Sequence, residues 1–302
     1  MYNKKHVVVF GSNGMLGNTI KMYFKSMNKY EVISLTRKHY DILNSEINEL
    51  IYLFKVFPDN SVIINATGLI PHTGNNNTND YLKINCEFPK LLDKLCLEYN
   101  HTFIHITTDC VFNGLDKGNY AEDSIKNETS IYGKSKALGE ELTNATIIRT
   151  SIIGEQSEPK EQSEPKEQLK ENDKCNKKLS LLQWVISNKG KNVDGYINHY
   201  WNGVTCFRLS QILHKIIDKS LYWKGVSHIF SNTVSKYELL NYINIIYNLD
   251  INIKSVKCNI SIDKTLSSKH ITNDIINQYV DKKDIYQQIK EQMIFFKKWH
   301  HI

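Results

Sequence analysis

The sequence has no hydrophobic run long enough to cross a membrane. Its longest apolar stretches, such as residues 7–10 and 62–64, fall far short of the ~18 residues that a spanning helix needs. The first ten residues are also too few for the apolar core of a secretory signal peptide. We therefore expect no membrane partner and a cytoplasmic location.

Cysteine pairs with metal-ligand spacing are missing as well. The six cysteines form no C-x-x-C motif, and in a cytosolic protein we expect them to be reduced thiols, so no metal site is predicted. The formal net charge of +6 is spread along the chain and predicts no nucleic-acid partner. A composition of 41% hydrophobic and 23% charged residues excludes collagen-like, coiled-coil and wholly disordered proteins.

Short apolar runs alternate with helical patterns through the first half of the chain. A continuous apolar run bounded by turn residues is typical of a strand that is buried on both faces. Strands that alternate with helices predict an α/β fold with a doubly wound parallel Rossmann sheet. The expected strands are residues 6–10, 30–35, 62–65, 103–107 and 146–149, and the expected helices are residues 18–26, 47–57, 82–98 and 132–142.

The second half of the chain has weaker signals. We expect helices at residues 179–187, 205–219, 236–247 and 274–298, and a strand at residues 228–231. Between residues 155 and 176 the pattern becomes polar, and the hexapeptide S-E-P-K-E-Q occurs twice in tandem at residues 157–168. Such a segment cannot bury enough apolar area to offset its ordering entropy, so we expect a mobile surface insertion rather than a charged lid.

Glycines at the spacing G-x-x-G-x-x-G follow the first expected strand. Gly11 permits the tight turn, Gly14 lets the backbone approach a pyrophosphate, and Gly17 packs the helix against the strand. The start of the helix adds free N–H groups and the positive end of its dipole. We therefore predict a dinucleotide site. Its contacts in this loop are Gly11, Asn13, Gly14, Met15, Leu16 and Gly17.

The second expected strand ends in a basic turn of Thr36, Arg37 and Lys38, where an NAD enzyme would carry a carboxylate for the ribose 2′-hydroxyl. Arg37 can form a forked pair with a phosphate, and Lys38 can add a second charge. This turn favours NADPH over NADH as the cofactor, and a solvated basic turn is the alternative. Asp41 either accepts a hydrogen bond from the adenine amine or caps the helix that follows.

Tyr132 and Lys136 are four residues apart, so both side chains share one face of the helix expected there. An ammonium beside a phenol favours the phenolate and lowers the tyrosine pKa from about 10. Such a tyrosine can donate and accept a proton near neutral pH. The spacing alone also fits an exposed amphipathic helix, so its context decides.

The glycine loop, the segment H-I-T-T-D-C-V-F-N-G at residues 105–114 and the Y-x-x-x-K pair occur in that order. In this the chain resembles extended short-chain dehydrogenases/reductases, and specifically the dTDP-4-dehydrorhamnose reductase family. Cys110 and Asn113 depart from the family's pattern. The resemblance is good over residues 6–154 and thin beyond them. Other positions that match the family are Asn65, Ala66, Asn85 and residues 148–150, 201–205 and 263–267.

The resemblance implies NADPH-dependent reduction of the C4 ketone of a nucleotide-linked 4-keto-6-deoxyhexose, in deoxysugar biosynthesis. Tyr132 would protonate the C4 oxygen, Lys136 would hold the nicotinamide ribose, and Thr108 would hydrogen-bond the same oxygen. Thr107 is expected to be a buried strand residue. The remaining predicted contacts are Ala66, Thr67 and Gly68 for the cofactor, and Thr108, Asp109, Cys110, Trp201 and Asn202 for the substrate. For Trp201 and Asn202, a structural role in a glycine-bearing turn is the alternative.

Cys110 lies two residues after Thr108. In the related GDP-fucose synthases and bifunctional plant rhamnose synthases, a cysteine at this position acts in epimerisation. A thiolate beside the ketone could remove the acidified proton from the neighbouring carbon before reduction. The resemblance therefore adds C3 or C3/C5 epimerisation as a hypothesis, with Lys189 and His199 as candidates for the partner acid. A small buried residue that fills space is the alternative interpretation of Cys110.

The predicted architecture has two parts. Residues 1–150 and 205–232 would form an NADP-binding Rossmann domain, and residues 151–204 and 233–302 a smaller α/β substrate-binding domain. A homodimer is compatible with the sequence and is not specified by it. The alternative function is a non-catalytic NADP-binding subunit, because the regulatory subunit of methionine adenosyltransferase also resembles this family.

Overall fold

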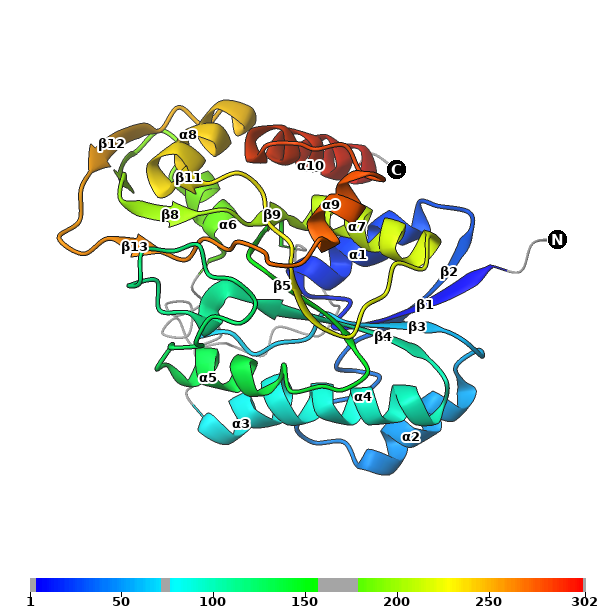
Figure 1. The fold of residues 1–302 in the computed structure, drawn as a ribbon. Helices are drawn as coiled ribbons and strands as arrows, with labels where there is room; N and C mark the ends of the chain where they lie inside the picture. Colours follow the sequence, from blue (N-terminus) through cyan, green and yellow to red (C-terminus); the bar gives the residue numbers. More distant parts are fainter. Residues whose placement is uncertain (1–3, 72–76, 157–178, 301–302) are drawn as a thin grey trace, which may run out of the picture.

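A six-stranded parallel sheet forms the centre of the computed structural model, which describes residues 4–71, 77–156 and 179–300 (Figure 1). The strand order is β10-β5-β4-β3-β1-β2, and every neighbouring pair is parallel. This confirms the predicted α/β fold with a doubly wound sheet. The strands are β1 Lys5–Phe10, β2 Tyr30–Leu35, β3 Val62–Asn65, β4 Thr102–Thr108, β5 Thr146–Thr150 and β10 Gly225–His228.

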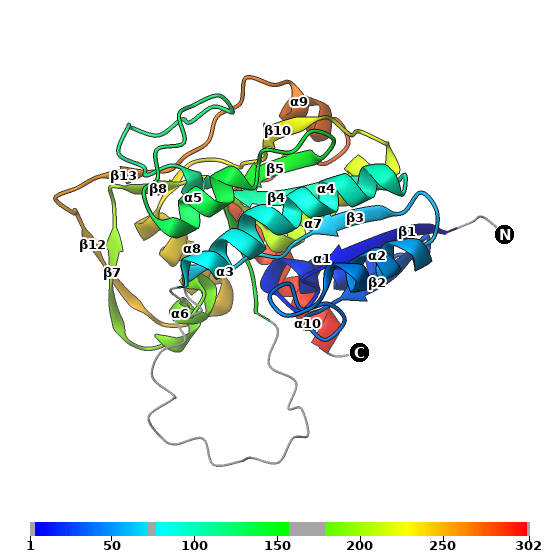
Figure 2. The ribbon, with the colours of Figure 1, turned by 90° about the horizontal axis from the view of Figure 1, so that it is seen from below.

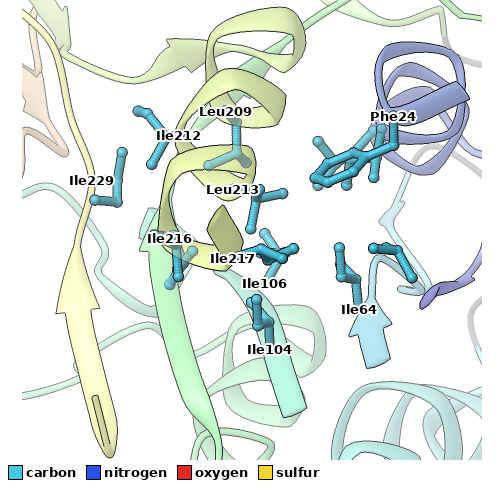
Figure 3. Packing of buried hydrophobic residues seen from close by; sticks show 14 of the residues in the cluster. Phe24, Ile64, Ile104, Ile106, Leu209, Ile212, Leu213, Ile216, Ile217 and Ile229 are labelled. Atoms are coloured by element: carbon cyan, nitrogen blue, oxygen red, sulfur yellow. The ribbon is translucent and has the colours of Figure 1, made fainter. Parts of the chain in front are cut away.

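Helices cover both faces of the sheet, which explains why its strands are almost continuously apolar. On one face lie α1 Met15–Lys25 and α7 Cys206–Asp218, and on the other lie α2 Ile47–Val56 and α4 Phe88–Glu98 (Figures 1 and 2). Each fully buried aliphatic side chain contributes about 1.5–3 kcal/mol, so these two layers are a major source of stability. In the layer of α1 and α7 (Figure 3), packed side chains include Phe24, Leu209, Leu213, Ile64, Ile104 and Ile106.

A second region of short strands and helices begins where β5 ends (Figure 1). It has its own apolar core, which includes Leu182, Leu239 and Ile289. Strand β8 lies between β11 and β13, β7 pairs with β12, and β6 pairs with β9. The elements are β6 Ile152–Ile153, α6 Leu181–Ser187, β7 Asn192–Tyr196, β8 His199–Trp201, β9 Val204–Thr205, β11 Val234–Ser235, α8 Lys236–Tyr247, β12 Asn252–Val256, β13 Ile262–Asp263 and α10 Ile285–His300. Helix α9 Thr272–Asn277 packs instead against α7 and β10, where Ile276 joins the core of the sheet layer.

Several bounds expected from the sequence are wrong. The helix expected at residues 82–98 begins earlier and contains a π-helical turn, because α3 Thr78–Leu82 continues through η2 Lys83–Glu87 into α4. The strand expected at residues 228–231 is β10, three residues earlier, where Gly225 to His228 pair with β5. The helix expected at residues 274–298 is divided into α9 and α10.

The sequence analysis also missed the short strands of the second region. They contain two to five residues, and β12 has exposed and half-buried residues rather than an apolar run, so no periodicity marked it. Of the expected insertion at residues 155–176, all but the first two residues lie outside the described residues. Within the described residues, no helix has the length and apolar character needed to span a membrane.

Candidate active site

A cleft of about 380 Å³ lies at the carboxyl ends of β1, β2 and β3. The strand order reverses between β1 and β3, and doubly wound sheets bind ligands in the crevice at this kind of switch point. The cleft also has apolar lining that no sequence motif indicated, including Tyr40, Leu69 and Ile84. The predicted cofactor residues that line it are Gly11, Asn13, Gly14, Thr36, Arg37, Asp41, Ala66, Thr67 and Gly68.

The glycine turn leaves its backbone open to a phosphate. Gly11 has a φ of +75°, and a β-carbon there would lie 3.0 Å from the backbone of Ala66. At Gly17 a β-carbon would overlap the carbonyl oxygen of Gly11. Helix α1 has no acidic residue in its first turn, so its N–H groups and positive dipole end remain suited to an anion. These features fit the pyrophosphate of a dinucleotide.

Four predicted cofactor residues of the two loops do not line the cleft. Leu16 and Gly17 are buried, so these two residues can reach a cofactor only through their backbone, whereas Met15 is half-buried and packs against the core that contains Leu16. Lys38 is exposed. Their assignment to the cofactor stays a prediction.

The basic turn after β2 places Arg37 on the rim of the cleft. The carboxylate of Asp41 accepts hydrogen bonds from the backbone N–H of Leu43 at 3.1 Å and the side-chain amide of Asn44 at 2.9 Å. Asp41 therefore braces its own turn. It does not cap α2, which begins with a capping box formed by Glu46 and Glu49.

The predicted proton donor and its lysine lie on helix α5 Ile131–Leu138, which Ser130 caps at its start. Tyr132 lies close enough to Thr108, the last residue of β4, for the threonine hydroxyl to lower the pKa of the phenol slightly. Lys136 is buried, and its Nζ would lie 3.2 Å from a β-carbon at Gly68, a residue of the cleft lining. The structure thus brings the three predicted catalytic residues Thr108, Tyr132 and Lys136 to the edge of the cofactor cleft.

The protonation of Tyr132 differs from the sequence expectation. Burial and the neighbouring Cys110 raise the pKa of Tyr132, against a smaller lowering by the hydroxyl of Thr108. Burial also lowers the pKa of Lys136 to about 8, while the carboxylate of Glu140 acts to raise it. The expectation of a lowered tyrosine pKa is therefore wrong for this structure, because the desolvation of the buried phenol is the largest influence on it.

Asn85 has a structural role that the sequence did not indicate. Its side chain bonds both the backbone N–H and the carbonyl of Leu69 at 2.9 Å, and donates to Ser135 Oγ at 3.1 Å. Asn85 lies in the π-helical turn η2, and such turns are frequent at functional sites. It ties the cleft lining to the catalytic helix and so fixes the spacing between Gly68 and Lys136.

The turn after Thr108 carries an acid and a thiol. Thr108 Oγ1 donates to Asp109 Oδ1 at 3.1 Å and accepts from the backbone N–H of Cys110 at 3.1 Å. Burial raises the pKa of Asp109, which lies in a site with few solvent contacts. Burial and the neighbouring Asp109 raise the pKa of Cys110 to about 12. The thiol is therefore protonated at neutral pH, which does not favour the activated base that the resemblance suggested.

Thr107 is the buried strand residue that the sequence predicted. It donates to Glu140 at 3.0 Å, on the opposite side of β4 from Thr108. Glu140 also accepts two hydrogen bonds from Arg149, and Arg149 donates to Nε2 of His228 at 2.8 Å. Fully paired buried charges of this kind hold neighbouring strands in register under the site.

The predicted substrate residues Trp201 and Asn202 have different surroundings. Trp201 Nε1 donates to Ser151 Oγ at 2.8 Å, and Ser151 is close enough to Asp109 to lower the pKa of that carboxyl, so the indole lies near the catalytic turn. Asn202 is buried, and its amide group bonds both the carbonyl and the N–H of Leu266. As placed, Asn202 holds two segments of the chain together, which is the alternative that the sequence left open.

Among the described residues, neither candidate for the partner acid forms a hydrogen bond or an ion pair with Cys110. Lys189 is exposed in the turn after α6. His199 lies on β8 with its ring 4.7 Å from that of Tyr196, and burial lowers its pKa. The roles of Lys189 and His199 as partner acid therefore stay predictions.

A family model described as the RmlD substrate binding domain matches residues 5–174. A dTDP-4-dehydrorhamnose reductase of Aggregatibacter actinomycetemcomitans is 30% identical over 152 residues, which are 48% of this chain and 50% of the relative. A spore coat polysaccharide biosynthesis protein of Bacillus subtilis is 33% identical over 165 residues, 48% of this chain and 52% of the relative. The chain spans about half the length of the curated relatives it matches.

Solved structures match over nearly the whole chain. A dTDP-4-dehydrorhamnose reductase of Clostridium acetobutylicum has a TM-score of 0.75 and 19% identity, and the match covers 97% of this chain and 99% of that one. The same enzyme of Bacillus anthracis, in complex with NADP, has a TM-score of 0.74 and 17% identity over 97% and 99% of the two chains. At these identities the structures establish the shared fold.

Proposed function

Because this chain belongs to the family described as the RmlD substrate binding domain, we propose that it is an NADPH-dependent reductase of the C4 ketone of a nucleotide-linked 4-keto-6-deoxyhexose. The observation that carries the proposal is the convergence of Thr108, Tyr132 and Lys136 beside a dinucleotide-shaped cleft. The names of the relatives support the same substrate class, since one is a dTDP-4-dehydrorhamnose reductase and another a dTDP-4-keto-6-deoxy-D-glucose reductase.

Three features of the cleft support NADPH as the cofactor. The turn of Gly11 to Gly17 and the start of α1 suit a pyrophosphate. Arg37 on the rim suits a ribose 2′-phosphate, because a guanidinium pairs with phosphate through two parallel hydrogen bonds. A bound nicotinamide supplies the hydride that reduces C4.

The protein's own groups handle the proton and the charge on the ketone oxygen. Tyr132 carries its proton at neutral pH, and burial keeps it in this form, so it can donate the proton to the C4 oxygen as negative charge develops there. Thr108 hydrogen-bonds the same oxygen as negative charge develops there. Lys136, with a pKa of about 8, remains mostly charged at neutral pH and holds the ribose next to Gly68.

The test is to incubate the protein with NADPH and a panel of 4-keto-6-deoxy sugars linked to dTDP, UDP or GDP. We expect NADPH absorbance to fall with at least one of them, and NMR of the product to show a hydroxyl at C4. Tight NADPH binding without consumption across the whole panel would instead support the non-catalytic regulatory subunit.

Epimerisation before reduction is the second candidate function, and the position of Cys110 is the observation that favours it. The thiol lies in the turn that directly follows Thr108, and its environment couples it to Tyr132. Its pKa of about 12 opposes a role as base. The thiol could act as a base only if substrate binding changed the charges around it so that its pKa fell.

Deuterium exchange tests this second candidate. If the protein epimerises, substrate incubated in D2O without NADPH takes up deuterium at C3, or at C3 and C5. The Cys110→Ser variant then loses most of that exchange but still reduces a pre-epimerised substrate, because a hydroxyl is a far weaker base than a thiol. Wild-type protein without any exchange is a plain 4-reductase.

A further inference from the structure

Lys264 comes from the second region, yet it lies beside the catalytic helix. It belongs to residues 262–267, here called the strap, which crosses the loop between β4 and α5. The backbone N–H of Asp263 donates to the carbonyl of Gly114 at 2.8 Å, and that of Tyr120 donates to the carbonyl of Thr265 at 2.9 Å. Both hydrogen bonds flank Lys264, so the backbone of this residue has a fixed position.

The ammonium of Lys264 pairs with a carboxylate at the start of α5. Lys264 Nζ lies 3.4 Å from Glu128 Oε2, and the two side chains are only 22% and 18% exposed. The other oxygen, Glu128 Oε1, accepts hydrogen bonds from the backbone N–H groups of Thr129 at 2.8 Å and Ser130 at 2.9 Å. Glu128 thus connects Lys264 to Thr129 and to Ser130, the residue that caps the helix that carries Tyr132.

The same carboxylate lies directly against the catalytic helix. A β-carbon at Gly133 would overlap both the side chain of Glu128 and the carbonyl oxygen of Cys110. The glycine therefore lets Glu128, the catalytic turn and the residue next to Tyr132 meet at one point. A displacement of Glu128 would be transmitted to Tyr132 and to Cys110.

The charge of Lys264 also acts on the turn of Asp109 and Cys110. Its positive charge favours the ionised form of both groups, against the effect of burial. The other ionisable groups that act on the thiol are Asp109 in the same turn and Tyr132 on α5. The negative charge of Asp109 disfavours a thiolate at Cys110, and Tyr132 is a buried phenol.

We propose that Lys264 is a positioning residue of this site, which divides its positive charge between Glu128 at the start of the catalytic helix and the turn of Asp109 and Cys110. The effect of Lys264 on catalysis rests on the proposed function. Its geometry predicts that Lys264 and Glu128 affect the thiol in opposite directions. Removal of the ammonium disfavours the thiolate, whereas removal of the Glu128 charge frees the ammonium and favours it.

The experiment measures how fast iodoacetamide alkylates Cys110 between pH 7 and 10, with each cysteine peptide followed by mass spectrometry. The variants are Lys264→Met, Glu128→Gln and Lys264→Arg. Glutamine keeps an oxygen for the two backbone N–H groups and removes only the charge. Alkylation of Cys258, the other half-buried cysteine among the described residues, is the internal control.

We expect Lys264→Met to slow alkylation of Cys110 by about three- to tenfold and Glu128→Gln to accelerate it by a similar factor, since one pKa unit changes the thiolate fraction tenfold. Lys264→Arg should keep the wild-type rate. Shifts in the same direction for Lys264→Met and Glu128→Gln, or no shift in either, would overturn the proposal. If Lys264→Met does not fold, acceleration in Glu128→Gln supports the proposal and its absence contradicts it.

The thiol measurement is independent of the reaction. Should no sugar nucleotide be reduced, the alkylation rates still decide the role of Lys264. If the reductase activity is present, Lys264→Met should also lower kcat while the Kd for NADPH stays unchanged, because Lys264 does not line the cofactor cleft.

Discussion

In the first half of the chain, the residues that line the cofactor cleft follow strands of four to six residues in a parallel sheet, whereas the second region reaches the site through strands of two or three residues. Neighbouring parallel strands have their carboxyl ends at the same edge of the sheet. The motifs that follow β1, β2 and β3 therefore lie close together without further long-range contacts. The strap and Trp201 reach the site only because β8, β13 and the strap pair with distant segments. The comparison shows that local sequence motifs place the cofactor-binding residues, whereas pairing between distant segments places the residues that surround them.

The largest effect is expected for the chemical step in the first half. Tyr132→Phe removes the donated proton and should lower turnover by about 10²–10⁴ while NADPH binding stays close to wild type. Steady-state NADPH consumption and fluorescence titration of NADPH measure the two quantities. Tyr200→Phe, an exposed tyrosine on β8, is the matched variant in the second region and should retain turnover. Retained turnover in Tyr132→Phe would refute the role of this residue.

Two glycines offer a matched test of the two regions. A β-carbon would overlap the carbonyl oxygen of Gly11 at position 17, and that of Ser151 at position 203. Each alanine variant should lose roughly 3 kcal/mol of unfolding free energy in urea titrations, because backbone atoms cannot move aside easily. Only Gly17→Ala should also abolish NADPH binding.

Gly190→Ala is the control for these variants, since a β-carbon there would meet open space and only the φ of +71° is unfavourable. It should cost about 1 kcal/mol. If Gly203→Ala weakened NADPH binding as much as Gly17→Ala, the cofactor cleft would depend on the second region more than the structure indicates.

A buried histidine joins the two regions and should make stability depend on pH. His228 accepts from Arg149 and donates from Nδ1 to the carbonyl of Ser267, and burial lowers its pKa to about 4. The unfolded chain takes up a proton near pH 6.5 and the folded chain does not. His228 therefore does not lower the free energy of unfolding above pH 6.5, but it lowers this free energy by about 3 kcal/mol as the pH decreases towards 4.

Urea unfolding in steps between pH 7 and 4.5 measures this slope, and the His228→Asn variant is the control. The variant should be less stable at every pH. Its free energy of unfolding should fall less steeply with decreasing pH, because unfolding takes up about one proton fewer than in the wild type. Equal slopes in the two proteins would mean that other groups cause the pH dependence.

The smallest effect is expected for cofactor choice, which depends on one exposed side chain. Arg37→Ala should weaken NADPH binding more than NADH binding by roughly tenfold or more, because a hydrogen bond to a charged group is worth about 1.5–3 kcal/mol. Titration with both cofactors measures the ratio. Equal losses would show that Arg37 does not contact the 2′-phosphate, and the solvated basic turn would then be the correct interpretation.

The sequence was most informative where one residue type has one local consequence. The glycines of the turn, the four-residue spacing of Tyr132 and Lys136 and the buried strand position of Thr107 all follow from backbone geometry and periodicity. The pKa of Tyr132 and the roles of Asn85 and Asn202 could not be predicted in this way. Each depends on which distant groups surround the side chain, and a sequence pattern does not contain that information.

By itself, the sequence determined the α/β alternation, the glycine turn and the order of the motifs, because hydrophobic periodicity and turn chemistry are local properties. Only the tertiary structure decided that burial raises the pKa of Tyr132 and of Cys110 and that Lys264 reaches Glu128 beside the catalytic helix. Burial and charge act through space, so residues more than a hundred positions apart in the chain can set the protonation of one site.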